Sequence, residues 1–193
     1  IEDLGFKVKL GELTEKRANQ GYRPAPGKAR AEEFMKLYQD AEVKGLIATL
    51  GGMNSSSLIP HLDYQFIREN PKVICGYSDV TSLHLAILHY SGVRTFYGPA
   101  LMSWFSEWPD GEKETIESFL KAVSQETSYP RLLQPFKRWS KHFRDWCDDS
   151  WKNIEREWIT NKGWKVLNPG KASGQILICN LNTLMSAAGT DYF

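Results

Sequence analysis

The residues best placed to do chemistry lie in the stretch GYSD, where a short apolar run meets a helical pattern. Val73–Cys75 is typical of a buried strand, and apolar residues at helical spacing begin at Val80. Ser78 is therefore expected at the turn between a strand and a helix. A serine held there can attack a carbonyl carbon if a base and oxyanion-stabilising N–H groups lie nearby. The position also suits a helix cap, so both roles remain open.

Candidate donors for an oxyanion lie in two glycine-containing turns. Gly76 permits a tight turn two residues before Ser78, although Val80 stands where the pattern G-x-S-x-G has its second glycine. The N–H of Asp79, at the start of the expected helix, is the first candidate donor. The Gly51-Gly52 pair ends a preceding apolar run and can approach Ser78 closely because glycine has no side chain.

The histidines do not supply a clear base for this serine. His84 lies six residues after Ser78, about 9 Å further along a helix and on another face. His84 and His89 are expected on the surface or against the sheet, and His142 in solvent. His61 follows Pro60 near the Gly51-Gly52 turn and can line the same cleft.

The composition is that of an ordinary globular protein: 193 residues, 41% hydrophobic, 24% charged, with a formal net charge of +1. This charge gives no reason to expect binding to nucleic acid or to a membrane surface. No apolar run approaches the roughly 20 residues of a spanning helix, and no signal-peptide pattern is present. Cys75, Cys147 and Cys179 form no C-x-x-C pair, which favours reduced thiols in a cytoplasmic protein and argues against a metal site.

Apolar runs and amphipathic segments alternate over the first two thirds of the chain. Strands are expected at 6–10, in GLIATLGG (45–52), at 73–75 and at 95–97, and helices at 28–41, in part of 55–70, at 80–90 and at 111–125. Continuous apolar strands between such helices predict an α/β fold with a mostly parallel sheet, flavodoxin-like or Rossmann-like, covered by helices on both faces.

From residue 129 the character of the chain changes. Five of the seven tryptophans lie between Trp139 and Trp164, and Trp139, Phe143 and Trp146 have helical spacing. This pattern predicts either a helix packed on the protein or a ligand-stacking lid. We therefore expect an α/β domain at 1–128, a Trp-rich helical insert or linker at 129–168, and the start of a β-rich C-terminal domain at 169–193.

Two stretches resemble the LD-carboxypeptidase family of serine peptidases, in particular its microcin C self-immunity branch. The first is Gly51–Leu101, with the motifs GGMNS, NPKVICGYSDVT and TFYGPAL in order. The second is SGQILICNLNTLMSAAGTDYF, which is similar to the opening of the family's C-terminal domain. Ile178-Cys179 departs from this pattern, because a Gly-Gly pair is usual there.

The resemblance implies roles for particular residues. Ser78 is the implied nucleophile, with the N–H of Asp79 and that of Gly52 or Met53 as the oxyanion hole. The implied substrate-binding residues are Gly51, Asn54, Trp158 and Trp164, the two tryptophans stacking on a nucleobase. The family's triad is Ser-Glu-His, and its Glu and His belong to a C-terminal domain beyond residue 193.

The implied reaction is hydrolysis of an amide bond next to a free carboxylate, through an acyl-enzyme and without metal or cofactor. The substrate is either a murein tetrapeptide or a peptidyl or aminoacyl nucleotide, and a cytoplasmic homodimer is expected. One alternative is a non-catalytic relative that holds a peptide or nucleotide in the same cleft. Another is a flavodoxin-like domain with phosphate at its helix N-termini, although no G-x-G-x-x-G or Walker loop is present.

Overall fold

The computed structural model describes residues 1–15, 25–108, 111–124, 132–141, 144–145 and 149–193. The chain forms two compact units, of which the larger comprises 1–106 with 177–193 and the smaller 107–176. The limits of these units differ from the predicted domain boundaries, which fall after residues 128 and 168. The predicted boundaries stay predictions.

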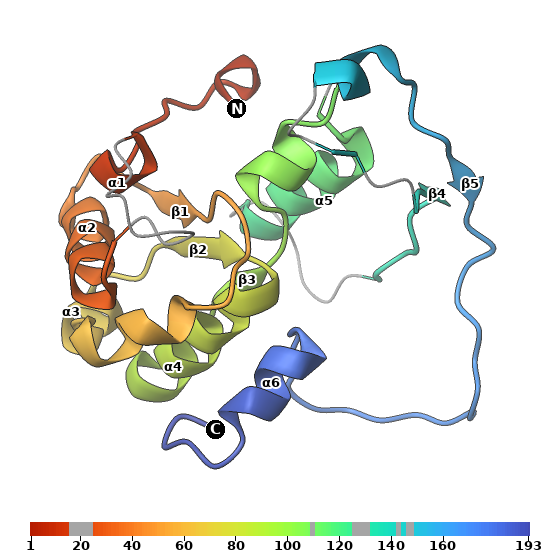
Figure 1. Cartoon of the computed structure of the whole chain (residues 1–193). Coiled ribbons are helices and arrows are strands. Elements are labelled where there is room, and N and C mark those ends of the chain that lie inside the picture. The colour runs from red at the N-terminus through yellow and green to blue at the C-terminus, as the bar shows by residue number, and fades with distance from the viewer. Residues whose placement is uncertain (16–24, 109–110, 125–131, 142–143, 146–148) are drawn as a thin grey trace. The chain divides into compact units, whose positions relative to one another are not determined.

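A parallel three-stranded sheet forms the centre of the larger unit (Figure 1). Its order is β1 (Gly45–Ile47), β2 (Val73–Gly76) and β3 (Phe96–Tyr97), so β2 is central. In the register, Ile47 lies opposite Cys75, and Gly76 lies opposite Tyr97. The parallel sheet confirms the predicted α/β class; β1 and β3 lie within the predicted ranges, and β2 extends one residue beyond the predicted 73–75, to Gly76.

The helices of this unit come before, between and after its strands. They are η1 (Glu2–Leu4), α1 (Glu12–Glu15), α2 (Gly27–Gln39), η2 (Ser55–His61), α3 (Tyr64–Glu69), η3 (Ser78–Val80), α4 (Thr81–Ser91), η4 (Leu101–Phe105) and α6 (Leu181–Ala187). The 28–41 and 80–90 predictions are confirmed by α2 and α4. Pro60 lies inside the 3-10 helix η2.

The hydrophobic core joins α2, η2, α3 and α4 with the central strand. Its buried members include Ala31, Met35 and Tyr38 of α2, Ile74 of β2, and Leu83, Ala86 and Ile87 of α4. Helix α4 is buried along its whole first half, from Thr81 to Ile87, so it is the central helix of the unit. The buried residues of α2 are Ala31, Met35 and Tyr38, whereas Ala41 lies beyond the helix and is exposed.

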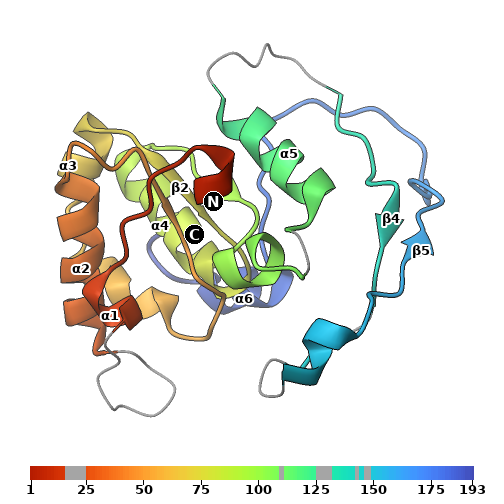
Figure 2. The ribbon, with the colours of Figure 1, turned by 90° about the horizontal axis from the view of Figure 1, so that it is seen from above.

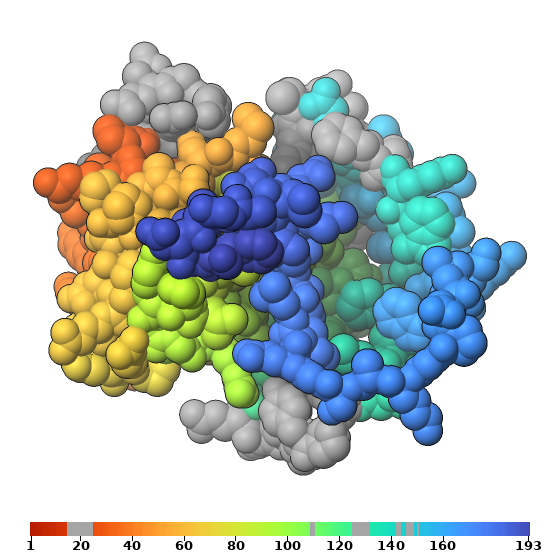
Figure 3. Space-filling model, turned by 90° about the horizontal axis from the view of Figure 1, so that it is seen from below, coloured from red at the N-terminus to blue at the C-terminus, as the bar shows by residue number. Residues whose placement is uncertain are grey.

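The C-terminal helix α6 packs against α4 (Figure 3). The Asn180 N–H donates to Thr81 Oγ1 at 2.9 Å, and the Asn180 side chain caps α6 by accepting from the Thr183 N–H at 3.0 Å. Ala187 is buried, and Tyr192 packs against the core cluster. A segment nearly 100 residues away in sequence therefore closes one side of the helix that follows Ser78.

The predicted strand at 6–10 is absent from the described structure, and no strand is found there in the segment before Asn180, where a β-rich domain is predicted to start. Residues 6–10 have no strand partner, and Phe6, Val8 and Leu10 are exposed. The strand-like stretch before Asn180 is also unpaired, with Ile176 exposed. In both stretches the residue pattern suits a strand, but a strand also needs a neighbour to satisfy its backbone groups, and none of the described segments provides one.

The smaller unit contains α5 (Lys113–Val123), β4 (Arg138–Trp139), η5 (Asp149–Asn153) and β5 (Ile159–Thr160). Strands β4 and β5 pair antiparallel, with Trp139 opposite Ile159 (Figure 2). The predicted aromatic helix is wrong at Trp139, because β5 offers that residue a strand partner. Phe143 and Trp146, the other members of that pattern, and His142 lie outside the described residues. Helix α5 confirms the 111–125 prediction.

The described residues contain neither a candidate membrane-spanning helix nor a candidate metal-binding cluster. None of the helices in that part of the chain has the length and apolar character to cross a bilayer. The same residues contain no cluster of three or more His, Cys, Asp or Glu side chains that could hold a metal ion.

Candidate active site

Ser78 occupies a left-handed bend directly after the central strand. Its φ is +57°, and it is the one non-glycine residue with positive φ in the part of the chain that the structure describes. Tyr77 before it is extended, and Thr81 after it is already helical. An L-residue with a side chain is held in this conformation only when its surroundings favour it, and such residues cluster at functional sites.

Neighbouring strands and glycines hold the bend in place. The Ser78 N–H donates to the phenolic oxygen of Tyr97, on β3, at 3.0 Å. A Cβ added to Gly76 would lie 2.8 Å from Val80 Cγ1 and 3.1 Å from the Cβ of Ala48, so only glycine fits. Val80, which replaces the second glycine of the elbow pattern, therefore packs directly on Gly76.

The Gly51-Gly52 turn passes beside the serine. A Cβ on Gly51 would lie 2.8 Å from Ser78 Cβ and 3.3 Å from Ser78 Oγ. Gly52 and Met53 are exposed, Met53 with 79% of its surface accessible. The structure thus brings the predicted glycine turn to the predicted nucleophile.

The Asp79 carboxylate ties this turn to the bend. Asp79 is buried, and its Oδ2 accepts the N–H groups of Asn54 and Ser55 at 2.8 and 2.7 Å. Neither η3 nor α4 has a side-chain cap hydrogen bond at its start. The capping alternative for Ser78 and Asp79 is therefore wrong: the Asp79 side chain binds another loop, and no hydrogen bond of Ser78 Oγ is found among the described residues.

Asn54 is held from the opposite side by helix α2. Arg30 donates to Asn54 Oδ1 at 2.7 Å and to its carbonyl oxygen at 3.2 Å, and the Ser57 hydroxyl donates to the same carbonyl at 2.7 Å. Asn54 is one of the predicted substrate-binding residues, and its side-chain oxygen is bonded to Arg30.

His84 lies buried beneath the bend. Its Nε2 is 3.1 Å from the carbonyl oxygen of Gly76, its ring stacks edge-on against Tyr97, and its Nδ1 has no hydrogen-bond partner among the described atoms. Burial lowers the pKa of His84, and the hydrogen bond to Gly76 opposes this shift only in part. His61 and His89 are exposed. None of these three described histidines is hydrogen-bonded to Ser78, in agreement with the sequence analysis.

The residues next to the bend complete its surroundings. The Tyr77 hydroxyl is 3.1 Å from Ser103 Oγ, and its ring meets Trp104 edge-on. Burial raises the pKa of the Cys75 thiol to about 12, so this cysteine is a neutral core residue and not a second nucleophile.

Sequence reasoning missed Tyr97, His84 and Arg30 as neighbours of the site. That Tyr97 lies near the site can be recognised only once the strand order is known, because the register of β2 and β3 sets Tyr97 opposite Gly76. Arg30 approaches because α2 packs against η2. Its position in the sequence, 24 residues before Asn54, gives no local sign of this contact.

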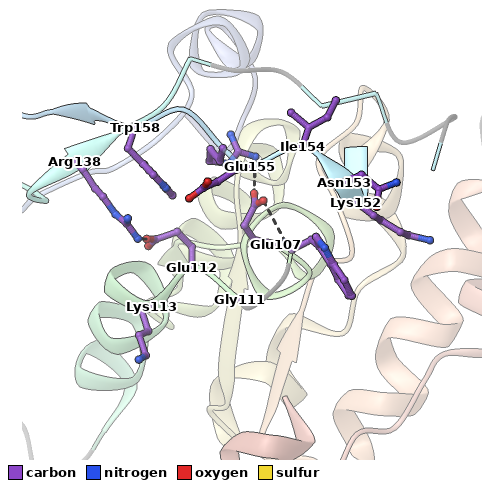
Figure 4. A pocket seen from close by; sticks show the side chains of 12 residues that line it. Glu107, Gly111, Glu112, Lys113, Arg138, Lys152, Asn153, Ile154, Glu155 and Trp158 are labelled. Carbon is purple, nitrogen blue, oxygen red and sulfur yellow. Dashed lines mark hydrogen bonds and ion pairs between the residues drawn. The ribbon is translucent and has the colours of Figure 1, made fainter. Parts of the chain in front are cut away.

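The smaller unit has a separate cavity of about 480 Å³ (Figure 4). Trp158 lines it, and the Arg138 guanidinium lies 3.9 Å from the centre of the Trp158 ring. Glu107 and Arg156 line the same cavity and are 2.5 Å apart, and Glu107 also accepts from Arg144, which is not among the lining residues, at 2.9 Å. Trp164 does not line this cavity and is 74% exposed.

The fold and this bend define a parallel α/β domain that presents a serine between its central strand and a helix. The profile of the "LD-carboxypeptidase N-terminal domain" matches residues 1–98. The chain therefore belongs to the LD-carboxypeptidase family.

Individual relatives agree with this assignment. The microcin C7 self-immunity protein MccF of Escherichia coli is 36% identical over 192 residues, which cover 100% of this chain and 55% of that protein. A solved structure of MccF in complex with aspartyl sulfamoyl adenosine has a TM-score of 0.87 at 36% identity, covering 99% of this chain and 56% of that one. A Bacillus subtilis protein named "Probable murein peptide carboxypeptidase" is 29% identical over 194 residues, covering 100% of this chain and 51% of that protein. The chain spans about half the length of the curated relatives it matches.

Proposed function

We propose that Ser78 is the nucleophile of a serine peptidase that hydrolyses an amide bond next to a free carboxylate. The observation that carries the proposal is the left-handed backbone of Ser78, at φ +57°, directly after the central strand. This conformation turns the residue out of the strand, and its hydroxyl is not used as a helix cap. Family membership favours a peptidase over other uses of such a bend.

The proposed reaction proceeds through an acyl-enzyme. Ser78 Oγ attacks the carbonyl carbon of the substrate, its proton passes to a base, and the carbonyl oxygen becomes an oxyanion. The N–H of Asp79 and the N–H of Gly52 or Met53 are the proposed donors to that oxyanion. The amine then leaves with a proton, and water hydrolyses the acyl ester to release the acid.

The general base of this reaction is not among the described histidines. His84 is the one nearest in sequence, but its Nε2 is bonded to the carbonyl of Gly76, and burial lowers its pKa. We propose that a Glu-His pair of the kind found in this family, outside these 193 residues, completes the triad.

Two substrate classes fit the proposal. MccF has been solved in complex with aspartyl sulfamoyl adenosine, and the B. subtilis relative is named for murein peptides. A flat nucleobase suits a tryptophan platform, so Trp158 and Trp164 favour the nucleotide conjugate. In the described structure the Arg138 guanidinium lies over the Trp158 ring, and a stacked base would have to displace it. The homodimer and the cytoplasmic location stay predictions.

Hydrolysis of a murein tetrapeptide and of aspartyl sulfamoyl adenosine by the full-length protein tests the proposal. We expect Ser78→Ala to abolish cleavage of whichever compound is the substrate. Ser186→Ala, at an exposed helical serine of α6, is the matched control and should cleave as the wild type does. Undiminished activity of Ser78→Ala would contradict the proposal.

The second candidate is a binding module without catalysis. It is favoured by the absence of a hydrogen bond between Ser78 and any of the described histidines. Tight binding of aspartyl sulfamoyl adenosine without cleavage, and with equal affinity in the wild type and in Ser78→Ala, would support this candidate over the peptidase.

A further inference from the structure

We propose that the Asp79 side chain is a positioning residue that fixes the glycine loop, residues 51–55, against the bend at Ser78. Through this contact the two proposed oxyanion donors, one on each segment, are held as a single preorganised unit. The inference rests on the proposed function, because it assigns a role within the same reaction.

Among the described residues, both hydrogen bonds of the Asp79 carboxylate run to the glycine loop. A single oxygen, Oδ2, accepts from the Asn54 N–H at 2.8 Å and from the Ser55 N–H at 2.7 Å. The same oxygen would lie 3.6 Å from a Cβ built on Gly52, so the carboxylate also lies against the glycine turn. Hydrogen bonds to an ionised acceptor are about twice as strong as neutral ones, so this is a firm attachment.

The attachment joins two segments that are far apart in the chain. Asp79 follows Ser78 directly and contributes its own N–H to the bend, whereas Asn54 and Ser55 follow Gly52 and Met53 by one to three positions. On its other side the loop is held by Arg30, through the side chain and carbonyl of Asn54. The loop is therefore tied between the bend and helix α2.

Burial distinguishes this carboxylate from an ordinary surface aspartate. Asp79 is only 9% exposed, and a buried carboxylate is costly unless its oxygens accept hydrogen bonds. A carboxylate at the start of a helix would satisfy that need by capping the helix, but this one is directed to another loop. Oxyanion donors act through fixed geometry, and a misplacement of about 1 Å can cost about 100-fold in rate.

Substitution of the side chain tests the inference, because the backbone N–H of residue 79 remains in every variant. In the full-length protein with aspartyl sulfamoyl adenosine or the murein tetrapeptide, whichever is cleaved, we expect Asp79→Ala to lower kcat about 100-fold. KM should stay within about twofold, since the loss acts on the transition state. Asp79→Asn keeps one carbonyl oxygen as acceptor and should recover part of the rate, with kcat reduced about tenfold.

Asp63 provides a matched control in the same unit. Its carboxylate also accepts a backbone N–H, that of Phe66 at 2.9 Å, but it caps the exposed start of α3. Asp63→Ala and Asp63→Asn should lose stability without a change in kcat. If Asp79→Ala does not fold, Asp79→Asn decides between the outcomes by the same split of kcat and KM.

The inference is overturned if both Asp79 variants fold and keep the wild-type kcat, or if they change KM alone. It is also overturned if their kcat falls no further than that of the matching Asp63 variants. If the wild type shows no hydrolysis that depends on Ser78, the proposed function itself fails and the inference with it. That outcome is distinct, because it appears before any Asp79 variant is made.

Discussion

The backbone N–H of Ser78 donates to the side-chain hydroxyl oxygen of Tyr97 across 3.0 Å. Tyr97 belongs to β3, which runs parallel to β2 and places Tyr97 opposite Gly76. The N–H of Ser78 is therefore bound by a residue of the neighbouring strand β3, and not by a group of its own segment. The left-handed conformation of Ser78 thus depends on the strand order of the sheet.

Tyr97→Phe removes this acceptor while keeping the ring. We expect a loss of about 1 kcal/mol in the free energy of unfolding, because the Ser78 N–H loses its partner. We also expect a lower kcat, since the bend loses one of its restraints. Urea denaturation and steady-state kinetics measure the two effects, with Tyr90→Phe on α4 as the control. Unchanged stability and unchanged kcat would show that the hydroxyl does not restrain the bend.

Gly51→Ala places a methyl group 2.8 Å from the Cβ of Ser78, closer than real contacts allow. The glycine loop must move away from the bend, so hydrolysis should fall by about 100-fold or more. Gly174→Ala is the control, because a Cβ there meets nothing within 4 Å. Rates are compared by steady-state hydrolysis with folding checked by circular dichroism. A fully active, folded Gly51→Ala would mean that the loop does not need this close approach.

Backbone strain at Ser78 can be measured by comparing the free energies of unfolding of two variants, Ser78→Gly and Ser78→Ala. A left-handed residue with a Cβ costs about 1–2 kcal/mol, so Ser78→Gly should unfold with a higher free energy than Ser78→Ala, by about 1 kcal/mol. At Ser186, inside helix α6, the order should reverse, because alanine is favoured over glycine there by about 1 kcal/mol. Chemical denaturation of the four variants gives both differences. Ser78→Ala being the more stable of its pair would contradict the strain.

Acidification should destabilise the fold through His84. Burial lowers the pKa of this histidine below its ordinary 6.5, so the unfolded chain binds the proton more readily than the folded one. The contribution of neutral His84 to the free energy of unfolding is present above pH 6.5. It is lost as the pH falls from there through the lowered pKa that His84 has in the folded state. Urea denaturation at a series of pH values should show this slope in the wild type.

His84→Gln is the decisive variant for that pH dependence. It keeps a donor for the Gly76 carbonyl but cannot titrate, so its free energy of unfolding should fall less below pH 6.5 than that of the wild type. His89→Gln, at an exposed position on the same helix, should keep the wild-type slope. Equal slopes in the wild type and His84→Gln would place the acid sensitivity elsewhere.

Local residue patterns were sufficient to predict the main helices and the central strand of the larger unit. The helical spacing in 28–41 and 80–90 predicted α2 and α4, and the apolar run at 73–75 predicted the central strand β2. The prediction was wrong for residues 6–10 and for Trp139, where the pattern indicated a strand and a helix respectively. Propensity describes what a segment can form, whereas strand pairing depends on which neighbour is available.

The sequence by itself determined the parallel α/β class and the place of Ser78 between a strand and a helix, because both follow from the spacing of nearby residues. Only the tertiary structure decided what surrounds Ser78. The contacts of Tyr97 with Ser78, of Gly51 with Ser78 and of Asp79 with Asn54 join residues 19 to 27 positions apart. Such contacts depend on strand order and helix packing, so hydrogen bonding across the sheet edge, and not local periodicity, sets the geometry of the site.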